Sequence, residues 1–101
     1  MDQYLKRFEQ HIATERNLSP LTVEAYLRDL HQFQDFLEQH NSTNSRENCL
    51  EHIDLLLLRQ YLAQLHKTCS RTSIARKLSA IKVFFRFLVR EGVLEDSPAE
   101  A

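Results

Sequence analysis

The stretch RTSIARKLSAIKVFFRFLVR, Arg71 to Arg90, decides the fold predicted for this chain. On a helical wheel its apolar side chains gather in one broad sector, centred on Ile74, Leu78, Ile81, Phe85 and Leu88. Ser70 precedes the stretch as a suitable N-cap, and Gly92 follows it as the left-handed residue that commonly ends a helix. We therefore predict a helix over residues 71–91 that packs between other helices.

The other side of this helix is basic. Residues 67–90 contain seven of the chain's 13 lysines and arginines and none of its 14 acidic residues, although the net charge of the chain is only -1. Such a local excess of cations attracts polyanions. Lysine and arginine also occur on solvated helix faces without any ligand, so charge alone leaves both interpretations open. The hydroxyls of Thr72, Ser73 and Ser79 favour DNA, because they lie among the cations and suit phosphates and base edges.

Three more helices are predicted before this one. Apolar residues recur at helical spacing over residues 2–16. A second helix is expected over residues 20–39, because Ser19 is a natural N-cap and Pro20 suits the first helical position. A third is expected over residues 54–67, and the polar segment between these two helices is predicted to be a loop. With one glycine and two prolines available for tight turns, the sequence predicts an all-α fold.

The composition restricts the class of protein. A chain of 101 residues with 43% hydrophobic residues is expected to form one domain with a real core. Its apolar runs are far shorter than the roughly 18 residues that a membrane span needs. The charged N-terminus lacks the apolar stretch of a signal peptide, so we expect a cytoplasmic protein with no membrane partner. Two cysteines fit reduced thiols in that compartment.

One arrangement of cysteine and histidine has the spacing of two zinc half-sites, Cys49-x-x-His52 and His66-x-x-Cys69. The predicted helix between them would hold His52 and His66 about 21 Å apart, which is much too far for one ion. Motifs for nucleophilic, phosphate-binding or metalloprotease chemistry are also missing from the sequence. We therefore expect a binding module with no catalytic residues, metal, cofactor or small-molecule substrate.

Two separated segments give the chain a family resemblance. Residues 18–37, LSPLTVEAYLRDLHQFQDFL, contain the pattern Ser-Pro-x-Thr-x-x-x-Tyr at the start of a helix. Residues 74–81, IARKLSAI, lead into FFRFL over residues 84–88. In this order the segments resemble the N-terminal domain of tyrosine recombinases, among them Xer recombinases and phage-type integrases. The resemblance covers nearly the whole chain and implies an all-α, four-helix SAM-like orthogonal bundle, the core-binding domain of these enzymes.

The resemblance implies a function as part of a larger enzyme. In such recombinases this domain is one half of a C-shaped clamp around a double-stranded DNA recombination site, and it also contacts other recombinase subunits, which assemble as a tetrameric synapse. The family's catalytic domain follows it, and the sequence here contains no His-x-x-Arg motif of that domain. We expect residues 1–92 to be the DNA-binding domain and residues 93–101 to begin a linker. Such a fragment is not expected to cut DNA.

The resemblance also implies which residues meet DNA, because the second and fourth helices of this domain enter adjoining grooves in the family. At the start of the second helix the matching positions are Ser19, Thr22 and Ala25. In the fourth helix they are Arg71, Thr72, Ser73, Arg76, Ser79, Lys82 and Arg86. The helical wheel independently places five of these fourth-helix residues in one sector. We expect Arg76 to read a guanine, since a bidentate arginine discriminates by about 1–3 kcal/mol, and Lys82 and Arg86 to neutralise phosphates.

A helical protein–protein interaction module without DNA binding is the alternative. The fourth helix would then dock on a partner, or Leu56 would do so from the face of the third helix opposite its apolar stripe. The two functions can coexist, because the domain contacts both DNA and other subunits in the family that it resembles.

Overall fold

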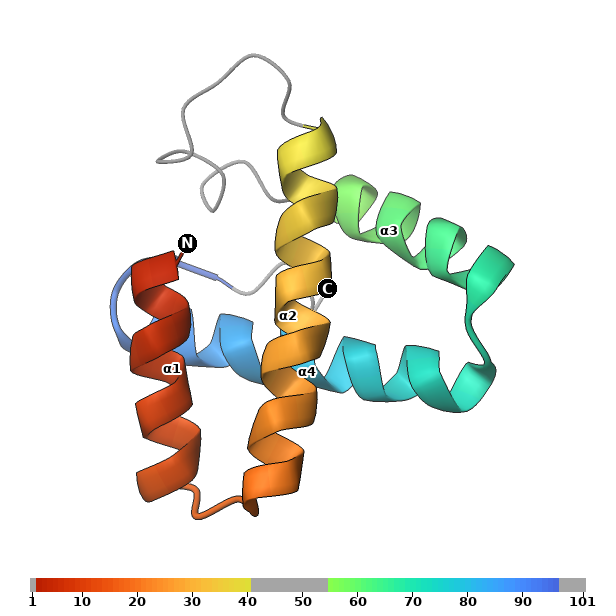
Figure 1. The fold of residues 1–101 in the computed structure, drawn as a ribbon. Helices are drawn as coiled ribbons and strands as arrows, with labels where there is room; N and C mark the ends of the chain where they lie inside the picture. The colour runs from red at the N-terminus through yellow and green to blue at the C-terminus, as the bar shows by residue number, and fades with distance from the viewer. Residues whose placement is uncertain (1, 41–54, 97–101) are drawn as a thin grey trace.

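The computed structural model describes residues 2–40 and 55–96, which form four helices and, within these ranges, no strand. Helix α1 spans Asp2–Thr14, α2 spans Pro20–His40, α3 spans Leu55–Thr68 and α4 spans Arg71–Arg90 (Figure 1). The predicted all-α fold is confirmed, and the ends of each helix differ from the predicted ends by no more than two residues. The loop predicted between α2 and α3 lies outside the described residues.

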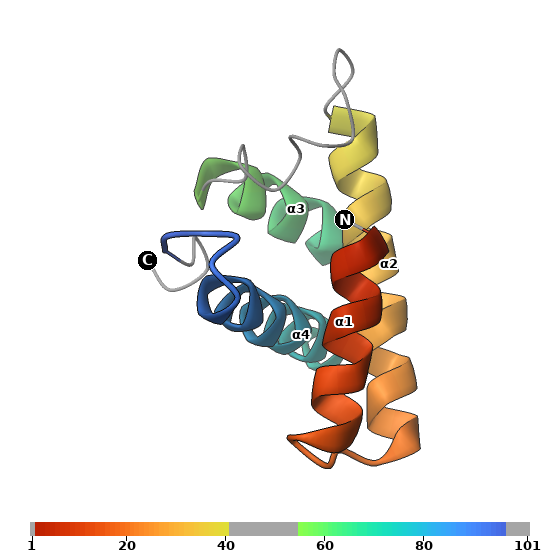
Figure 2. The same cartoon turned by 90° about the vertical axis from the view of Figure 1, so that its left-hand side faces the viewer.

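The helices are arranged around α2, the longest of them. Helices α1 and α2 lie side by side and antiparallel, joined by a short turn (Figure 1). Helix α4 crosses α2 steeply, and their contact is the most extensive between helices of the described residues (Figure 1). Helices α3 and α4 lie on the same side of the α1–α2 pair (Figure 2). The crossing of α2 and α4 therefore decides where the first turns of these two helices point.

Aromatic rings fill the space where the helices meet. Phe8 of α1 contacts Phe84 of α4 edge to face, with ring centroids 5.2 Å apart. Phe33 of α2 makes a similar contact with Phe85 of α4 at 6.0 Å. All four rings are fully buried, and such pairs add about 0.5–1.5 kcal/mol each beyond the area that they bury. Four of the five residues at the centre of the predicted apolar face of α4 are buried, namely Ile74, Ile81, Phe85 and Leu88, and Leu78 is half-buried.

Local hydrogen bonds fix the starts of α2 and α4. The Ser19 hydroxyl accepts the backbone N–H of Thr22 at 3.2 Å. The Ser70 hydroxyl accepts the backbone N–H of Ser73, also at 3.2 Å, and Ser70 has the extended backbone of an N-cap residue. Gly92 follows α4 with a φ of 79°, a backbone conformation that residues with a Cβ rarely adopt. Both predicted caps and the predicted glycine terminator are confirmed, so the starts of α2 and α4 and the end of α4 are each fixed at a defined residue.

Candidate nucleic-acid interface

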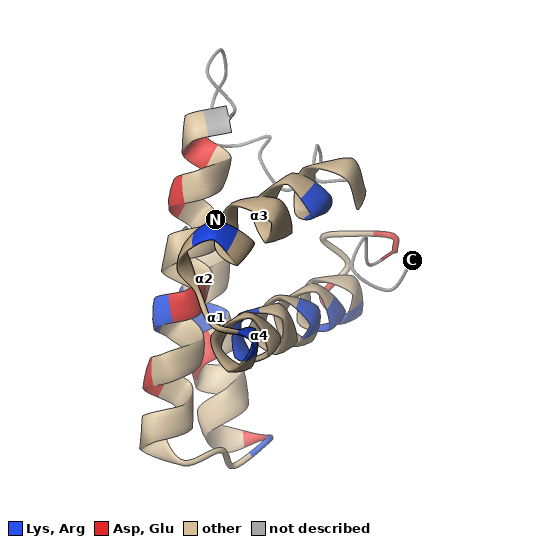
Figure 3. Ribbon diagram, turned by 90° about the vertical axis from the view of Figure 1, so that its right-hand side faces the viewer, with Lys and Arg blue, Asp and Glu red and all other residues tan. Residues whose placement is uncertain are grey.

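The ten residues predicted to meet DNA all have some access to solvent. Six are exposed: Ser19, Arg71, Thr72, Arg76, Ser79 and Arg86. Four are half-buried: Thr22, Ala25, Ser73 and Lys82. The rest of the described chain therefore leaves the residues predicted on α4 wholly or partly open to solvent, and lysines and arginines recur along this helix (Figure 3).

The two halves of the predicted set are connected through the helix crossing. Ala25 lies about one turn before Asp29 on α2, and Thr72 lies about one turn before Arg76 on α4. Arg76 contacts Asp29, so the contact between the two helices follows the first turns of both along the chain. Ser19 precedes Asp29 by about 15 Å along the axis of α2, at about 1.5 Å per residue. The first turns of α2 and α4 thus provide two spaced surfaces, joined where the helices cross.

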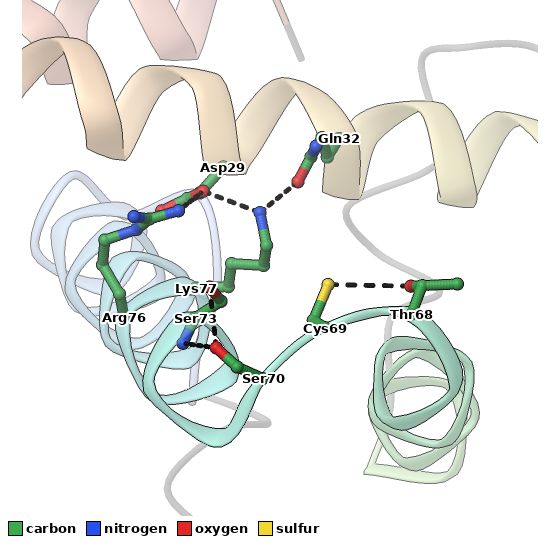
Figure 4. Close-up of polar contacts among 8 residues, drawn as sticks. All are labelled: Asp29, Gln32, Thr68, Cys69, Ser70, Ser73, Arg76 and Lys77. Carbon is green, nitrogen blue, oxygen red and sulfur yellow. Dashed lines mark hydrogen bonds and ion pairs between the residues drawn. The ribbon is translucent and has the colours of Figure 1, made fainter.

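A charged cluster holds this crossing together, and we term its members, Asp29, Gln32, Arg76 and Lys77, the Asp29 cluster. Arg76 donates from Nε to Oδ2 of Asp29 at 3.0 Å and from Nη2 to Oδ1 at 3.2 Å. Lys77 donates from Nζ to the same Oδ1 at 2.9 Å and also to Oε1 of Gln32 (Figure 4). Two cations of α4 therefore share one carboxylate of α2.

The members of the Asp29 cluster differ in burial. Asp29 is 1% exposed and Lys77 is 6% exposed, whereas the side chain of Arg76 is 45% exposed. Burying a carboxylate this deeply costs several kcal/mol, on the order of the penalty for any buried ion, unless it is paired. The hydrogen bond with Asp29 raises the pKa of Arg76, which stays positively charged. The cluster thus carries two positive charges and one negative charge, and Arg76 is the member that reaches the surface.

The Asp29 cluster was not predicted from the sequence. Lys77 belongs to the predicted basic segment, but it points into the helix crossing (Figure 4). It lies three residues after Ile74 and four before Ile81, both buried, which is the spacing of a core position. Asp29 has a similar position on α2, four residues before the buried Phe33. Such a pair is indicated in a sequence when a basic residue and an acidic residue occupy core positions of two different helices.

The far end of α4 carries a different set of charges. Arg7 of α1 pairs with Glu91 at 2.6 Å, and Arg90 pairs with Glu15 at 3.3 Å. These ion pairs border an open groove of about 280 Å³ between α1 and the end of α4. Because the cations here face carboxylates, this end of α4 is less suited to a polyanion than its start.

The described residues form neither a metal site nor a membrane span. Within residues 2–40 and 55–96, no three histidine, cysteine or acidic side chains are grouped so that they could hold a metal ion. No helix in these ranges combines the length and the apolar character needed to cross a bilayer. Cys49 and His52, one half of the zinc pattern in the sequence, lie outside the described residues.

Known proteins resemble this chain along most of its length. The family model of the phage integrase N-terminal SAM-like domain matches residues 5–92. The tyrosine recombinase XerC of Pelobacter propionicus is 44% identical over 98 residues, which are 97% of this chain and 32% of that protein. XerC of Lacticaseibacillus casei is 40% identical over 94 residues, 92% of this chain and 30% of that protein. XerC of Syntrophus aciditrophicus is 33% identical over 104 residues, covering 100% of this chain and 34% of that protein.

The chain spans about a third of the length of these relatives. No solved structure matches it significantly. The matched family region includes all four helices in whole or in large part, and with them every residue predicted to meet DNA.

Proposed function

The chain belongs to the phage integrase N-terminal SAM-like domain family, and we propose that it is the DNA-binding domain of a tyrosine recombinase. In this proposal residues 1–92 hold one arm of a double-stranded recombination site in the cytoplasm. Residues 93–101 begin the linker to a catalytic domain, which cuts and rejoins the DNA. Other recombinase subunits, assembled as a tetrameric synapse, are the further partners, and no cofactor takes part in the work of this domain.

An exposed row on α4 carries the proposal. Thr72, Ser79 and Arg86 recur every seven residues, so they line one side of the helix, and all three are exposed. Hydroxyl and guanidinium groups are the usual donors to DNA phosphates. The major groove of B-DNA is about 12 Å wide and admits an α-helix. The start of α4 adds the partial positive charge of a helix N-terminus. The membership of the chain in a recombinase family and the exposed polar row on α4 together support DNA as the ligand.

The start of α2 supports a second contact with the DNA backbone. The Ser19 and Thr22 hydroxyl oxygens lie 2.9 Å apart, so the two groups are close enough to bind one phosphate. Ala25 follows within one turn, and its small side chain allows the helix to approach the groove closely. In this proposal α2 positions the domain on DNA, while Lys82 and Arg86 of α4 neutralise further phosphates.

Removing one cation from α4 tests the proposal. Arg86→Ala should weaken binding to every duplex by a similar factor, because a phosphate contact carries no sequence information. Fluorescence anisotropy with two labelled duplexes of unrelated sequence measures this loss at low and at moderate salt. Lys6→Ala is the matched control, since Lys6 is an exposed cation on α1, which is not one of the two helices proposed to meet DNA. Equal affinities of Arg86→Ala and the unaltered chain would remove α4 from the interface.

Exposed leucines favour a second candidate, a protein–protein interaction module. Leu56 on α3 is 64% exposed, and Leu21 on α2 is 78% exposed. An NMR titration with duplex DNA distinguishes the candidates. Shifts gathered on the starts of α2 and α4 support the DNA-binding domain, whereas no response even at low salt supports the interaction module.

A further inference from the structure

Arg76 must serve two purposes if it reads a base, because its guanidinium is already paired with Asp29. We propose that buried Asp29 is a positioning residue that orients Arg76 toward DNA and thereby sets a base preference of the domain. This inference rests on the proposed function, because it concerns the selectivity of the same interface. Asp29 is 1% exposed, so it acts on DNA only through Arg76.

The pair with Asp29 uses one edge of the guanidinium. Nε and Nη2 donate to the two carboxylate oxygens at 3.0 and 3.2 Å. The donors of arginine form a rigid planar fork, so the neighbouring Nη1–Nη2 edge carries another parallel pair of N–H groups. Two parallel donors match the O6 and N7 atoms of guanine. The side chain of Arg76 is 45% exposed, which leaves solvent access to the guanidinium beyond the carboxylate.

Lys77 keeps the pair from losing its attraction for DNA. A carboxylate paired with one arginine would cancel the positive charge of that arginine. Asp29 is instead balanced from inside the crossing by Lys77, whose Nζ lies 2.9 Å from Oδ1 and which is too deeply buried to reach a ligand. Gln32 accepts a second hydrogen bond from Lys77 and so fixes the ammonium group. The positive charge of Arg76 therefore remains available to a polyanion.

Fixing Arg76 before DNA arrives should sharpen selectivity. A long exposed arginine loses rotamer freedom when it binds, and this loss opposes binding to any base. Arg76 has already lost much of that freedom, because two hydrogen bonds hold its guanidinium against a buried carboxylate. A fixed guanidinium also reaches only one base position, whereas a mobile one can reach neighbouring bases or phosphates. Orientation by Asp29 thus favours one guanine over other contacts.

The test selects duplexes from a library of randomised sequence with the 101-residue chain and with variants of it. Asp29→Leu combined with Lys77→Met removes both buried charges and keeps the crossing apolar, which such sites often tolerate. We expect this double variant to bind DNA but to lose, about tenfold, a guanine preference at one position, within the range of a lost bidentate contact. Arg76→Ala should lose the same preference at the same position, and adding it to the double variant should cause no further loss.

Two results of this selection have different consequences. A double variant that folds and keeps the guanine preference would overturn the inference and leave the proposed function intact. If the unaltered chain bound no library duplex at low salt, the proposed function itself would be overturned. Lys6→Ala is again the control, and its preferences should equal those of the unaltered chain.

A second measurement does not depend on a variant that folds. Nitrogen relaxation in NMR should report a rigid Arg76 Nε in the unaltered chain before DNA is added. Arg71, an exposed arginine of the same helix, provides the comparison and should be mobile. If Nε of Arg76 were as mobile as Nε of Arg71, the inference would be wrong whatever the DNA-binding results.

Discussion

The Asp29 carboxylate accepts hydrogen bonds from two adjacent residues of α4 and lies almost entirely out of solvent. Asp29→Ala should lower the free energy of unfolding by about 3–5 kcal/mol, because Lys77 would stay buried without a counter-charge. Chemical denaturation at neutral pH measures the loss. Glu91→Gln is the control: it removes a carboxylate from an exposed ion pair with Arg7 and should cost less than about 1 kcal/mol. Similar small losses in both variants would mean that the crossing does not depend on the cluster.

Tyr61 is the other residue at which burial has a measurable consequence. Its ring packs against those of Phe33 and Phe36, with centroids 5.1 and 4.8 Å away, and its hydroxyl is buried without a hydrogen-bond partner in the described part of the chain. Burial first, and the nearby charge of Asp29 second, raise the pKa of Tyr61 to about 12. An unfolded tyrosine ionises near a pKa of about 10.

These two pKa values predict how stability changes in alkali. Below pH 10 the Tyr61 hydroxyl is neutral in both the folded and the unfolded chain, so the contribution of its raised pKa to stability is fully present. As pH rises through 10 toward 12, the unfolded chain ionises first, so the free energy of unfolding falls. Tyr61→Phe should be as stable as the unaltered chain at pH 8, or more stable, because no hydrogen bond is lost. The free energy of unfolding should therefore fall more between pH 8 and pH 11 for the unaltered chain than for Tyr61→Phe, and unfolding curves at the two pH values measure the difference.

At the scale of the element, α4 depends on its first hydrogen bond. Ser70→Ala removes the acceptor of the Ser73 N–H and should cost about 1 kcal/mol, as N-cap losses typically do. Ser70→Asp keeps an acceptor and should restore stability, yet it places a negative charge at the proposed DNA surface. Thermal unfolding and DNA affinity measured on the two variants separate these effects. If Ser70→Asp bound DNA as well as the unaltered chain, the start of α4 would not face DNA.

The helices and their ends were predictable because their signals are local. Periodic apolar residues, Ser19, Ser70 and Gly92 each act within one or two turns, and the structure places helix ends beside all three. The site was harder to predict. Exposure of Thr72 follows from its place on the helical wheel. The inward direction of Lys77 does not, because it depends on which helix crosses α4 and on which residue of that helix lies opposite. Pairing across the crossing overrides the usual preference of lysine for solvent.

At the scale of the whole molecule, two kinds of charge should respond differently to salt. With about four phosphate contacts, the logarithm of DNA affinity should fall with the logarithm of salt concentration at a slope near -3.6, or about 150-fold between 50 and 200 mM. The pair of Asp29 and Lys77 is buried and should be screened far less. DNA affinity should therefore drop steeply over this range while the melting temperature changes little. Parallel losses of affinity and melting temperature would indicate that salt acts on the fold and not on an interface.

The division of α4 into an inward and an outward set of polar residues also makes the domain a scaffold for protein engineering. Thr72, Ser79 and Arg86 are exposed, so a combinatorial library at these three positions can vary the contacts with DNA at little risk to folding. Asp29 and Lys77 must be kept, or exchanged together, in any such library. The same condition applies to chimeras: a fourth helix grafted from a relative should be accompanied by the residue that meets it on the second helix.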